Sequence, residues 1–369
     1  MSSQLLNYSL GIDSSSKEFD ISLGQLDVEQ KYSTINSRKF TNTPGGFKNL
    51  LIWLEKNHKD KSVPLRITLE ATGVYHERLT YFLHEAGYDV SVVVPSKSKH
   101  YLRSLGYKSK TDKIDAKGLS CMGAQQQLKK WQPPSEQMRR LKRTTRLRET
   151  LQKTITMVSN QLHANKCAAG NNNEVMEYQQ EHLKFMKQQV KELDKRIEAI
   201  LAEDEAVARK VKGIADSLKG VGILTVAALI AETNGFEHIT SQSQLTSYSG
   251  YDIIENQSGS KRGKTKMSKQ GNSHIRRAMH MPALNVVRYE TGKFPALYKR
   301  VHQRTKIKMK GYVAVQRKLL CLIYTLWKND TVFEENYGDE QVQDNQQGET
   351  ANLNIGQCRA GAPLSGVAA

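Results

Sequence analysis

The stretch LLNYSLGIDS at residues 5–14, followed by KEFDISLGQL at 17–26, decides the fold of the N-terminal part of the chain. In both segments apolar residues alternate with polar ones, which is typical of strands that bury one face. The polar turn at 14–18 predicts that the two strands form an antiparallel hairpin. A third strand is expected near 32–40, so the chain begins with antiparallel strands.

Helices and strands alternate after this start. TPGGFKNLLIWLEKN at 43–57 predicts a helix, 65–69 a strand, 74–86 a second helix and 90–94 a further strand. The last of these is a continuous apolar run, as expected of a parallel strand that is buried on both faces. Strands that alternate with helices after an antiparallel start predict a mixed α/β sheet, in a domain that we place at 5–132.

The sequence changes character after a pair of prolines at 133–134. We expect a helical linker over 136–208, a mainly helical domain over 210–330 and a disordered acidic tail over 333–369. Within the linker, apolar residues recur at alternating spacings of three and four. These residues are Leu183, Met186, Val190, Leu193, Ile197 and Ile200. The spacing predicts a coiled-coil seam, and it leaves open whether the seam packs within one chain or between chains.

Composition excludes several classes of protein. The 369 residues are 38% hydrophobic, yet they include no apolar run long enough for a transmembrane helix. The first residues lack the basic and apolar regions of a secretory signal. The four cysteines are scattered and form no CxxC pair, so neither a zinc ribbon nor a disulfide framework is expected. A reducing, cytoplasmic location fits best.

The charge indicates a polyanionic partner. Lysine and arginine total 55 against 37 acidic residues, for a net charge of +18. The last forty residues contain seven acids and one base, so residues 1–329 carry +24. A globular body this basic favours nucleic acid as the partner, and no membrane-binding pattern competes with it.

Four carboxylates stand out. Asp13 and Glu70 each end a predicted strand, and Asp112 and Asp115 are three residues apart, on one face of a predicted helix. Ligands bind at the carboxyl ends of strands in open α/β sheets, so these acids could converge there. Together they would repel one another unless a cation lay between them, and oxygen ligands suit Mg²⁺, or Mn²⁺. The alternative is that each acid is a turn former or part of a solvated helix face.

The segment LKGVGILTVAAL at 218–229 is similar to a helix-hairpin-helix. There Gly220 and Gly222 would let backbone N–H groups at a helix N-terminus approach a phosphate. The alternative is an ordinary packing hairpin in which a glycine ends the first helix.

Basic residues gather in several segments that alternate with serine and glycine or form helix faces. The candidate nucleic-acid contacts, besides the two glycines, are Lys110, Lys113, Arg139, Arg140, Arg143, Lys261, Arg262, Lys264, Lys266, Lys269, Arg276, Arg277, Lys306 and Lys308. Such clusters position a phosphate backbone without reading its sequence. No zinc-finger spacing, basic zipper or RNA-binding aromatic pattern is present in the sequence.

Several of these motifs together resemble a known family. GIDSSSKEFD at 11–20, LEATGVY at 69–75, VSVVVPS at 90–96 and KTDKIDAKGLS at 110–120 resemble the DEDD domain of transposases of insertion sequence family 110. LKGVGILTVAALIAE and the segment from LTSYSGYD to MHMPALN, at 245–285, resemble the C-terminal transposase domain of the same family. The resemblance extends over about residues 7–327.

The resemblance implies a fold and a set of site residues. It implies an N-terminal RNase H-like (RuvC-like) domain, a helical linker and a mainly helical transposase domain with a catalytic serine. Asp13, Glu70, Asp112 and Asp115 would be the metal-binding tetrad. The serine of QSG, Ser258, would be the nucleophile. Because the stretch after Ser258 is about one residue shorter than expected, the alternatives Ser260 and Ser268 stay open.

The resemblance also implies an activity and partners. Members of this family are DNA recombinases guided by a bridge RNA that pairs with donor and target DNA, and they cut and rejoin strands through a phosphoserine. The resemblance implies a homo-oligomer, from dimer to tetramer, and leaves open whether tetrad and serine come from one chain. A prokaryotic protein associated with the nucleoid is expected.

Two other functions compete with this one. The tetrad alone would suffice for a metal-dependent endonuclease or junction resolvase that uses water as nucleophile. A protein that only binds nucleic acid would need neither tetrad nor serine. Covalent trapping of DNA separates the first from the second, and metal-dependent cleavage separates both from the third.

Overall fold

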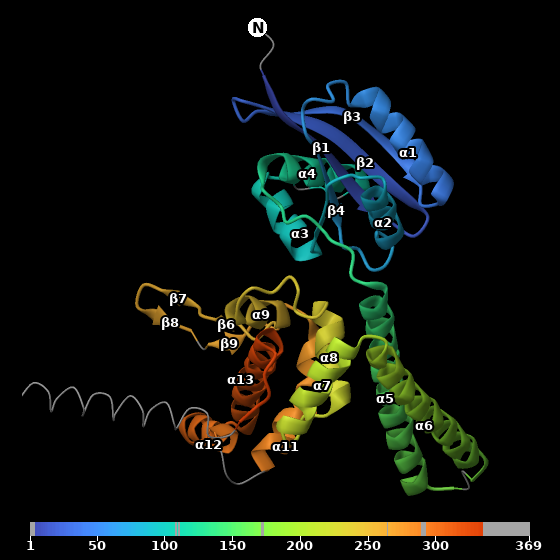
Figure 1. Cartoon of the computed structure of the whole chain (residues 1–369), viewed down its shortest axis with the longest axis vertical. Helices are drawn as coiled ribbons and strands as arrows, with labels where there is room; N and C mark the ends of the chain where they lie inside the picture. Colours follow the sequence, from blue (N-terminus) through green and yellow to red (C-terminus); the bar gives the residue numbers. More distant parts are fainter. Residues whose placement is uncertain are drawn as a thin grey trace, which may run out of the picture. The chain divides into compact units, whose positions relative to one another are not determined.

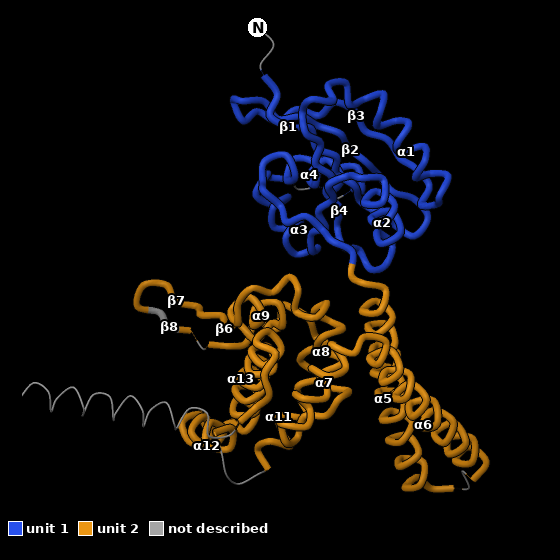
Figure 2. The backbone as a smooth tube through the Cα atoms, viewed as in Figure 1, with its two compact units in different colours: residues 1–133 blue, residues 134–369 orange. Residues whose placement is uncertain are grey.

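The computed structural model describes residues 4–107, 109, 111–170, 173–263, 265–288 and 293–334. The chain divides into two compact units, residues 1–133 and residues 134–369 (Figure 2). Each unit is described by itself. The second unit contains both the predicted linker and the predicted transposase domain, whose separation at residue 209 stays a prediction.

Unit 1 is built on a five-stranded mixed sheet (Figure 1). Its strands are β1 (Leu5–Ser14), β2 (Glu18–Asp27), β3 (Tyr32–Thr41), β4 (Leu65–Glu70) and β5 (Val90–Val93). Their order is β3-β2-β1-β4-β5, with antiparallel pairing among the first three and parallel pairing of β1 with β4 and of β4 with β5. This is the mixed sheet that the sequence predicts, and its strand order is that of the RNase H-like fold.

Helices cover both faces of this sheet. They are α1 (Pro44–Asn57), α2 (Glu77–Glu85), α3 (Pro95–Ser104) and α4 (Asp112–Gln125). Alternate residues of β1 point to opposite faces. Leu10 and Ile12 share one apolar core with α1 and α2, while α4 packs on the other face. Helix α2 begins three residues later than predicted, because the chain first turns at Gly73, whose φ is +56°.

Unit 2 begins with a long helical hairpin formed by α5 (Glu136–Cys167) and α6 (Asn173–Ala202) (Figure 1). Leu183, Met186 and Val190 of the predicted seam form one buried cluster with Ile155 and Val158 of α5. The seam therefore packs within the chain over this stretch, and α5 and α6 bury the apolar face that neither could bury alone.

The rest of unit 2 is mainly helical, as predicted. Its helices are α7 (Glu205–Ser217), α8 (Ile223–Thr233), α9 (Gln242–Ser249), α10 (Ser273–Ala278), α11 (His280–Arg288), α12 (Lys293–Thr305) and α13 (Lys308–Asn329). Buried residues of α8 and α13, among them Val226, Leu229, Val315 and Leu319, belong to one core. That core also includes Leu141 of α5, so the N-terminal part of α5 belongs to the bundle.

The serine- and glycine-rich segment between α9 and α10 contains strands, which the sequence analysis did not predict. It forms two short antiparallel ribbons, β6 (Ile253–Ile254) with β9 (Lys266–Met267) and β7 (Gln257–Ser258) with β8 (Lys261–Arg262). Strands of two residues are too short to show the alternation of apolar and polar residues that predicts a longer strand.

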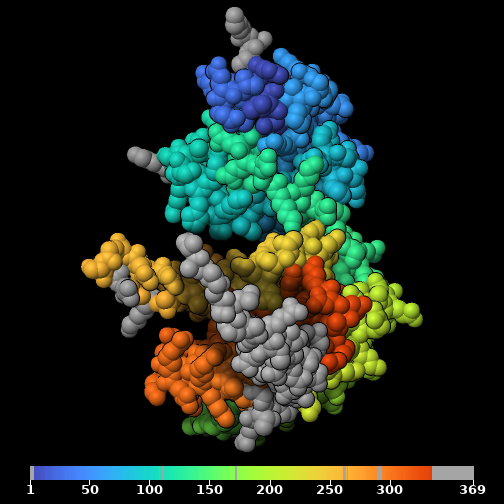
Figure 3. Space-filling view, turned by 60° about the vertical axis from the view of Figure 1, so that its left-hand side comes forward, coloured from blue at the N-terminus to red at the C-terminus, as the bar shows by residue number. Residues whose placement is uncertain are grey.

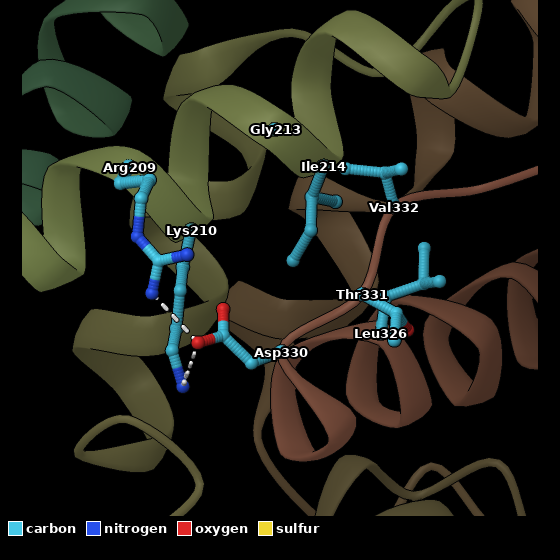
Figure 4. Close-up of a pocket in the computed structure, with 8 residues that line it drawn as sticks. All are labelled: Arg209, Lys210, Gly213, Ile214, Leu326, Asp330, Thr331 and Val332. Carbon is cyan, nitrogen blue, oxygen red and sulfur yellow. Dashed lines mark hydrogen bonds and ion pairs between the residues drawn. The ribbon is translucent and has the colours of Figure 1, made fainter.

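A small pocket lies where the chain leaves α13 (Figure 4). Asp330 accepts a hydrogen bond from Arg209 at 2.7 Å and lies 3.9 Å from the ammonium group of Lys210. The cavity is about 100 Å³, well below the ~300 Å³ at which ligand sites begin. We interpret it as the place where residues 330–333 dock on α7.

The segment that packs on α7 after the end of α13 extends to Phe333. The backbone N–H of Phe333 donates to Ser217, and its side chain packs against the core of unit 2. The predicted tail at 333–369 thus starts inside this segment, and 335–369 lies outside the described residues. Among the described helices, none is both long enough and apolar enough to span a membrane.

Candidate active site

Two of the four predicted carboxylates lie side by side at the carboxyl edge of the sheet. Strands β1 and β4 run parallel, and Ile12 is the register partner of Leu69. The next residues are Asp13 and Glu70, which therefore point to the same face from adjacent strands, about 4.8 Å apart at the backbone. The register of the sheet therefore brings these two acids to one edge.

Helix α4 brings the other two carboxylates to the same edge. Along α4, Ala124 accepts a hydrogen bond from Asn7, and the hydroxyl of Ser120 donates to the backbone oxygen of Ser9 at 2.6 Å. Four residues of a helix and two residues of a strand cover nearly the same length. Moving back four residues along α4 therefore corresponds to moving forward two residues along β1. The first turn of α4 then lies beside Asp13.

Gly11 makes this close approach possible. A Cβ atom at Gly11 would lie 2.1 Å from the backbone oxygen of Ala116 and 2.2 Å from the backbone nitrogen of Ser120. Neither backbone atom can move without moving α4. The glycine of the GIDS motif is therefore required by helix–strand packing, and it sets the height of α4 above the sheet.

The first turn of α4 carries Asp112, which is exposed, and Asp115, which is 8% exposed. The side chain of Thr111 caps this helix by accepting the N–H of Ile114. Acidic side chains are stabilised near a helix N-terminus by the helix dipole, which lowers the cost of holding two carboxylates there. An acidic residue is therefore favoured at these two positions whether or not it binds a metal ion.

Two polar side chains fix the loops around this edge. Ser98, which is buried at the start of α3, donates its hydroxyl to Glu70 at 2.5 Å. The Asn42 amide donates to the backbone oxygens of Ser15 at 2.8 Å and Tyr75 at 3.0 Å. Asn42 therefore links the turn after Asp13 to the loop after Glu70. Sequence reasoning missed both residues, because each looks like an ordinary turn or cap residue.

The donor set fits a hard divalent cation. All four groups are carboxylates, and the register of β1, β4 and α4 brings their backbones to one edge. Across the described residues, no three potential ligands already converge closely enough to hold a metal ion. The four carboxylates are therefore not arranged as a ready metal site in this structure, and binding would require their side chains to move.

Ser258 lies in unit 2, at the end of the β7–β8 hairpin. It pairs with Lys261 across a turn of Gly259 and Ser260, and Gly259 has a φ of +54°. Ser258 and Ser260 are both exposed. The hairpin projects from the body of unit 2, as the amber atoms in Figure 3 show. A hydroxyl in this position is open to a large substrate such as DNA.

The third serine candidate is in a different setting. Ser268 follows β9, and its backbone N–H donates to the backbone oxygen of Asp252 at 2.8 Å. Its hydroxyl accepts the N–H of Gln270, and the residue is half-buried. Ser268 therefore helps to hold the return of the hairpin to the bundle.

The two glycines of the helix-hairpin-helix candidate differ from each other. Gly220 has a φ of +95°, and a Cβ there would lie 3.1–3.3 Å from atoms of Asn285 and Val286. Its role is packing against α11. Gly222 is the residue before α8, and a Cβ there would meet nothing within 4 Å. Of the two, Gly222 is the one that leaves room for a phosphate.

The basic cluster of α5 is largely committed to internal ion pairs. Arg140 pairs with Glu203, Arg146 with Glu232 and Arg148 with Asp194. Arg139 and Arg143 are not without interaction partners either. The positive charge that the sequence shows here is therefore mostly neutralised inside unit 2.

Near α10 the arginines are also engaged. Arg276 donates to the backbone oxygens of Ser249 and Gly271, and Arg277 pairs with Glu149. Lys113, Lys266 and Lys269 are exposed. The candidates Lys110 and Lys264, and the side chains of Lys261 and Arg262, lie outside the described residues.

The corner between α12 and α13 shows the opposite behaviour. Residues 293–329 contain no acidic residue at all. Lys306, Lys308 and Lys310 are exposed there, and within the described part of the chain none of them forms an ion pair. This corner is therefore one basic surface whose charge, within the described residues, remains available to a ligand.

Comparison with known families identifies the chain. A model of the DEDD domain of IS110 transposases matches residues 10–165, and a model of the transposase IS116/IS110/IS902 family matches residues 213–299. The two matches together cover more than half of the sequence. The chain belongs to the IS110 family of transposases.

Several known proteins are similar to this transposase. Pilin gene-inverting proteins of Moraxella bovis and Moraxella lacunata are each 27% identical over 330 residues, covering 88% of this chain and 97% of the relative. Among solved structures, Thermus thermophilus RuvC with a Holliday junction substrate is similar at 13% identity and a TM-score of 0.26, covering 34% of this chain and 99% of RuvC. An Aquifex aeolicus PPX-GPPA enzyme matches 28% of this chain and 42% of its own, at 15% identity and a TM-score of 0.20.

Proposed function

We propose that this IS110-family transposase cuts and rejoins DNA through a covalent phosphoserine on Ser258, with Asp13, Glu70, Asp112 and Asp115 holding Mg²⁺. The observation that carries the proposal is the placement of Asp13 beside Glu70, under the first turn of α4. Mn²⁺ would suit the same oxygen ligands. When bound, such a cation stabilises the charge that develops on the phosphodiester.

The covalent step is a transesterification. The Ser258 oxygen attacks phosphorus and loses its proton, while the bond from phosphorus to one DNA oxygen breaks and that oxygen takes up a proton. Attack by the hydroxyl of another strand reverses these changes and restores Ser258. Each cut bond is thus conserved as a phosphoserine, and religation needs no external energy source. The exposed hairpin supports this role, because Ser258 is open to a bulky substrate.

The nucleic acids would bind mainly by their phosphates. Within the described residues, Lys306, Lys308 and Lys310 offer unpaired charge at the α12–α13 corner, and Lys266 and Lys269 follow the serine hairpin. No base-reading motif is apparent in the sequence, which favours recognition through a structured guide RNA that pairs with donor and target DNA. We further propose a homo-oligomer of two to four chains.

One specific observation favours a second function. All four carboxylates belong to unit 1, whereas Ser258 belongs to unit 2. A metal-dependent endonuclease that activates water would need nothing more.

Covalent trapping decides between the two. A DNA substrate with a nick near the cleavage site should give a protein–DNA adduct on denaturing electrophoresis, and peptide mapping should place it on Ser258. Ser258→Ala should abolish the adduct, with DNA and RNA affinity unchanged. Ser260→Ala and Ser268→Ala are matched controls that should retain it. Metal-dependent cleavage that persists without an adduct in Ser258→Ala would establish the nuclease instead.

A further inference from the structure

A buried carboxylate lies in the last turn of α8, outside every predicted site. Helix α8 contains no other charged residue, and Glu232 belongs to its buried face, with a side chain only 2% exposed. Leaving an ionised carboxylate in such a place is costly unless it is fully paired. The surroundings of Glu232 should therefore explain why the chain places a charge there.

Three segments of unit 2 meet at Glu232. The Arg146 guanidinium of α5 donates to both carboxylate oxygens, at 2.6 and 2.9 Å, and the Asn272 amide donates at 2.7 Å. The Tyr248 hydroxyl of α9 donates to the Glu232 backbone oxygen at 3.0 Å. Burial raises the pKa of Glu232, but the hydrogen bonds from Arg146 and Asn272 outweigh it and hold the pKa below its ordinary value. Glu232 is thus ionised and fixed from several sides.

Asn272 is the residue at which the serine-bearing segment returns to the bundle. Its backbone N–H donates to the backbone oxygen of Tyr248 at 2.8 Å, and its side-chain oxygen caps α10 by accepting the N–H of His274. Just before it, the N–H of Lys269 donates to the Gly250 oxygen. The segment that carries Ser258 is therefore anchored at its C-terminal end by Asn272, and Asn272 is held by Glu232.

A groove runs beside this network. It has a volume of about 350 Å³ and lies between α5, α8 and the α10–α11 region, with Arg146, Glu232 and His274 in its lining. Its cations are paired with acids, as Arg277 and Lys153 are with Glu149. The pair between Arg277 and Glu149 therefore joins α5 to α10, which follows the hairpin.

We propose that Glu232 positions the Ser258 hairpin by locking Asn272 to Arg146 of α5, so that the serine segment and the long helix keep one relative orientation. This inference rests on the proposed role of Ser258. A bidentate arginine pair with a third donor has only one good geometry, unlike an apolar contact, which tolerates sliding. Glu232 does not touch the reacting atoms and acts through Asn272.

Two variants break this lock at different points. Glu232→Gln keeps the volume but turns an amide N–H₂ toward the donors of Arg146 or Asn272. Asn272→Ser keeps a good helix cap for α10, while its side chain is too short to reach Glu232. Glu203→Gln is the matched control, because it removes an exposed ion pair with Arg140, which lies on α5 as Arg146 does.

The experiment measures the rate of adduct formation and hydrogen exchange by mass spectrometry on the full chain. Glu232→Gln and Asn272→Ser should each slow adduct formation about 10- to 100-fold at saturating DNA, as expected of a misplaced reacting group, with little change in the DNA concentration at half-maximal rate. Exchange should rise in peptides covering 266–278 and stay unchanged in unit 1. Glu203→Gln should match the wild type in both measurements.

Wild-type rates and exchange in both variants would overturn the proposal. A general rise in exchange throughout unit 2 would also overturn it, because Glu232 would then serve only stability. If the wild type itself forms no adduct, the proposed function fails, while the exchange pattern still tests the link between Glu232 and the hairpin.

Discussion

Asp13 ends a strand that is covered on both faces of its sheet, whereas Ser258 lies on an exposed hairpin with a two-residue turn. The carboxylate is held by the core of unit 1, so its placement is as rigid as the sheet. The serine depends on anchors at the base of its segment, such as Asn272. The position of Asp13 should therefore change when the packing of unit 1 is altered. The position of Ser258 should change when the residues at the base of its hairpin are altered.

The largest effect is expected from the carboxylate edge. Asp13→Asn keeps the side-chain shape and removes the charge, so strand cleavage should fall at least about 1000-fold. Mg²⁺ should also stop raising the melting temperature of unit 1, which a thermal scan with and without EDTA measures. Asp89→Asn, which alters an exposed pair with Lys130, is the control and should keep both properties. Full activity of the wild type in excess EDTA would contradict the metal site.

The same substitution in the two regions should differ sharply in cost. Gly11→Ala forces a methyl group against backbone atoms of α4 at 2.1 Å and should destabilise unit 1 by about 3 kcal/mol. Gly259→Ala meets no atom within 4 Å and has only a positive φ to strain, about 1 kcal/mol and local to the hairpin. Urea unfolding of both variants tests this. Equal losses would mean that the hairpin is packed as tightly as the sheet.

A second comparison is between two basic regions of unit 2, the α12–α13 corner and helix α5. Lys306, Lys308 and Lys310 are exposed and unpaired within the described residues, so replacing all three with alanine should lower the salt slope of nucleic-acid binding by about 2 to 3. Arg140→Ala should change the slope by less than a single lysine does, because Arg140 is paired with Glu203. Binding isotherms at several salt concentrations measure both. A larger effect of Arg140 would reverse the assignment.

The smallest effect concerns pH. The pKa of Glu232 is lowered in the folded protein, so its ionised form contributes stability that is present above its ordinary value of 4.5 and lost as the pH falls below it. The difference in urea midpoint between the wild type and Glu232→Gln should therefore narrow below pH 4.5. A difference that stays constant down to pH 3 would show that the charge of Glu232 is not what the network uses.

Much of unit 1 could be predicted from the sequence, because alternation in a strand and spacing in a helix are local properties. The hairpin at residues 5–26 and the parallel strands were found in this way, while the role of the four acids stays a prediction. The start of α2 was predicted three residues too early, since apolar residues at 74 and 75 continue the helical pattern although Gly73 turns the chain. The strands around Ser258 were missed, because each has only two residues and is too short to show an alternating pattern.

The sequence by itself determined the family, the sheet and the identity of the candidate carboxylates and serine. Only the tertiary structure decided which charges are available and which residues hold the reactive ones. Arg140 finds its partner 63 residues away and Arg146 finds Glu232 at a distance of 86 residues. Such pairs are set by how helices pack, and no local pattern encodes them. The sequence therefore gives the number of charges, while packing decides whether the fold has already neutralised them.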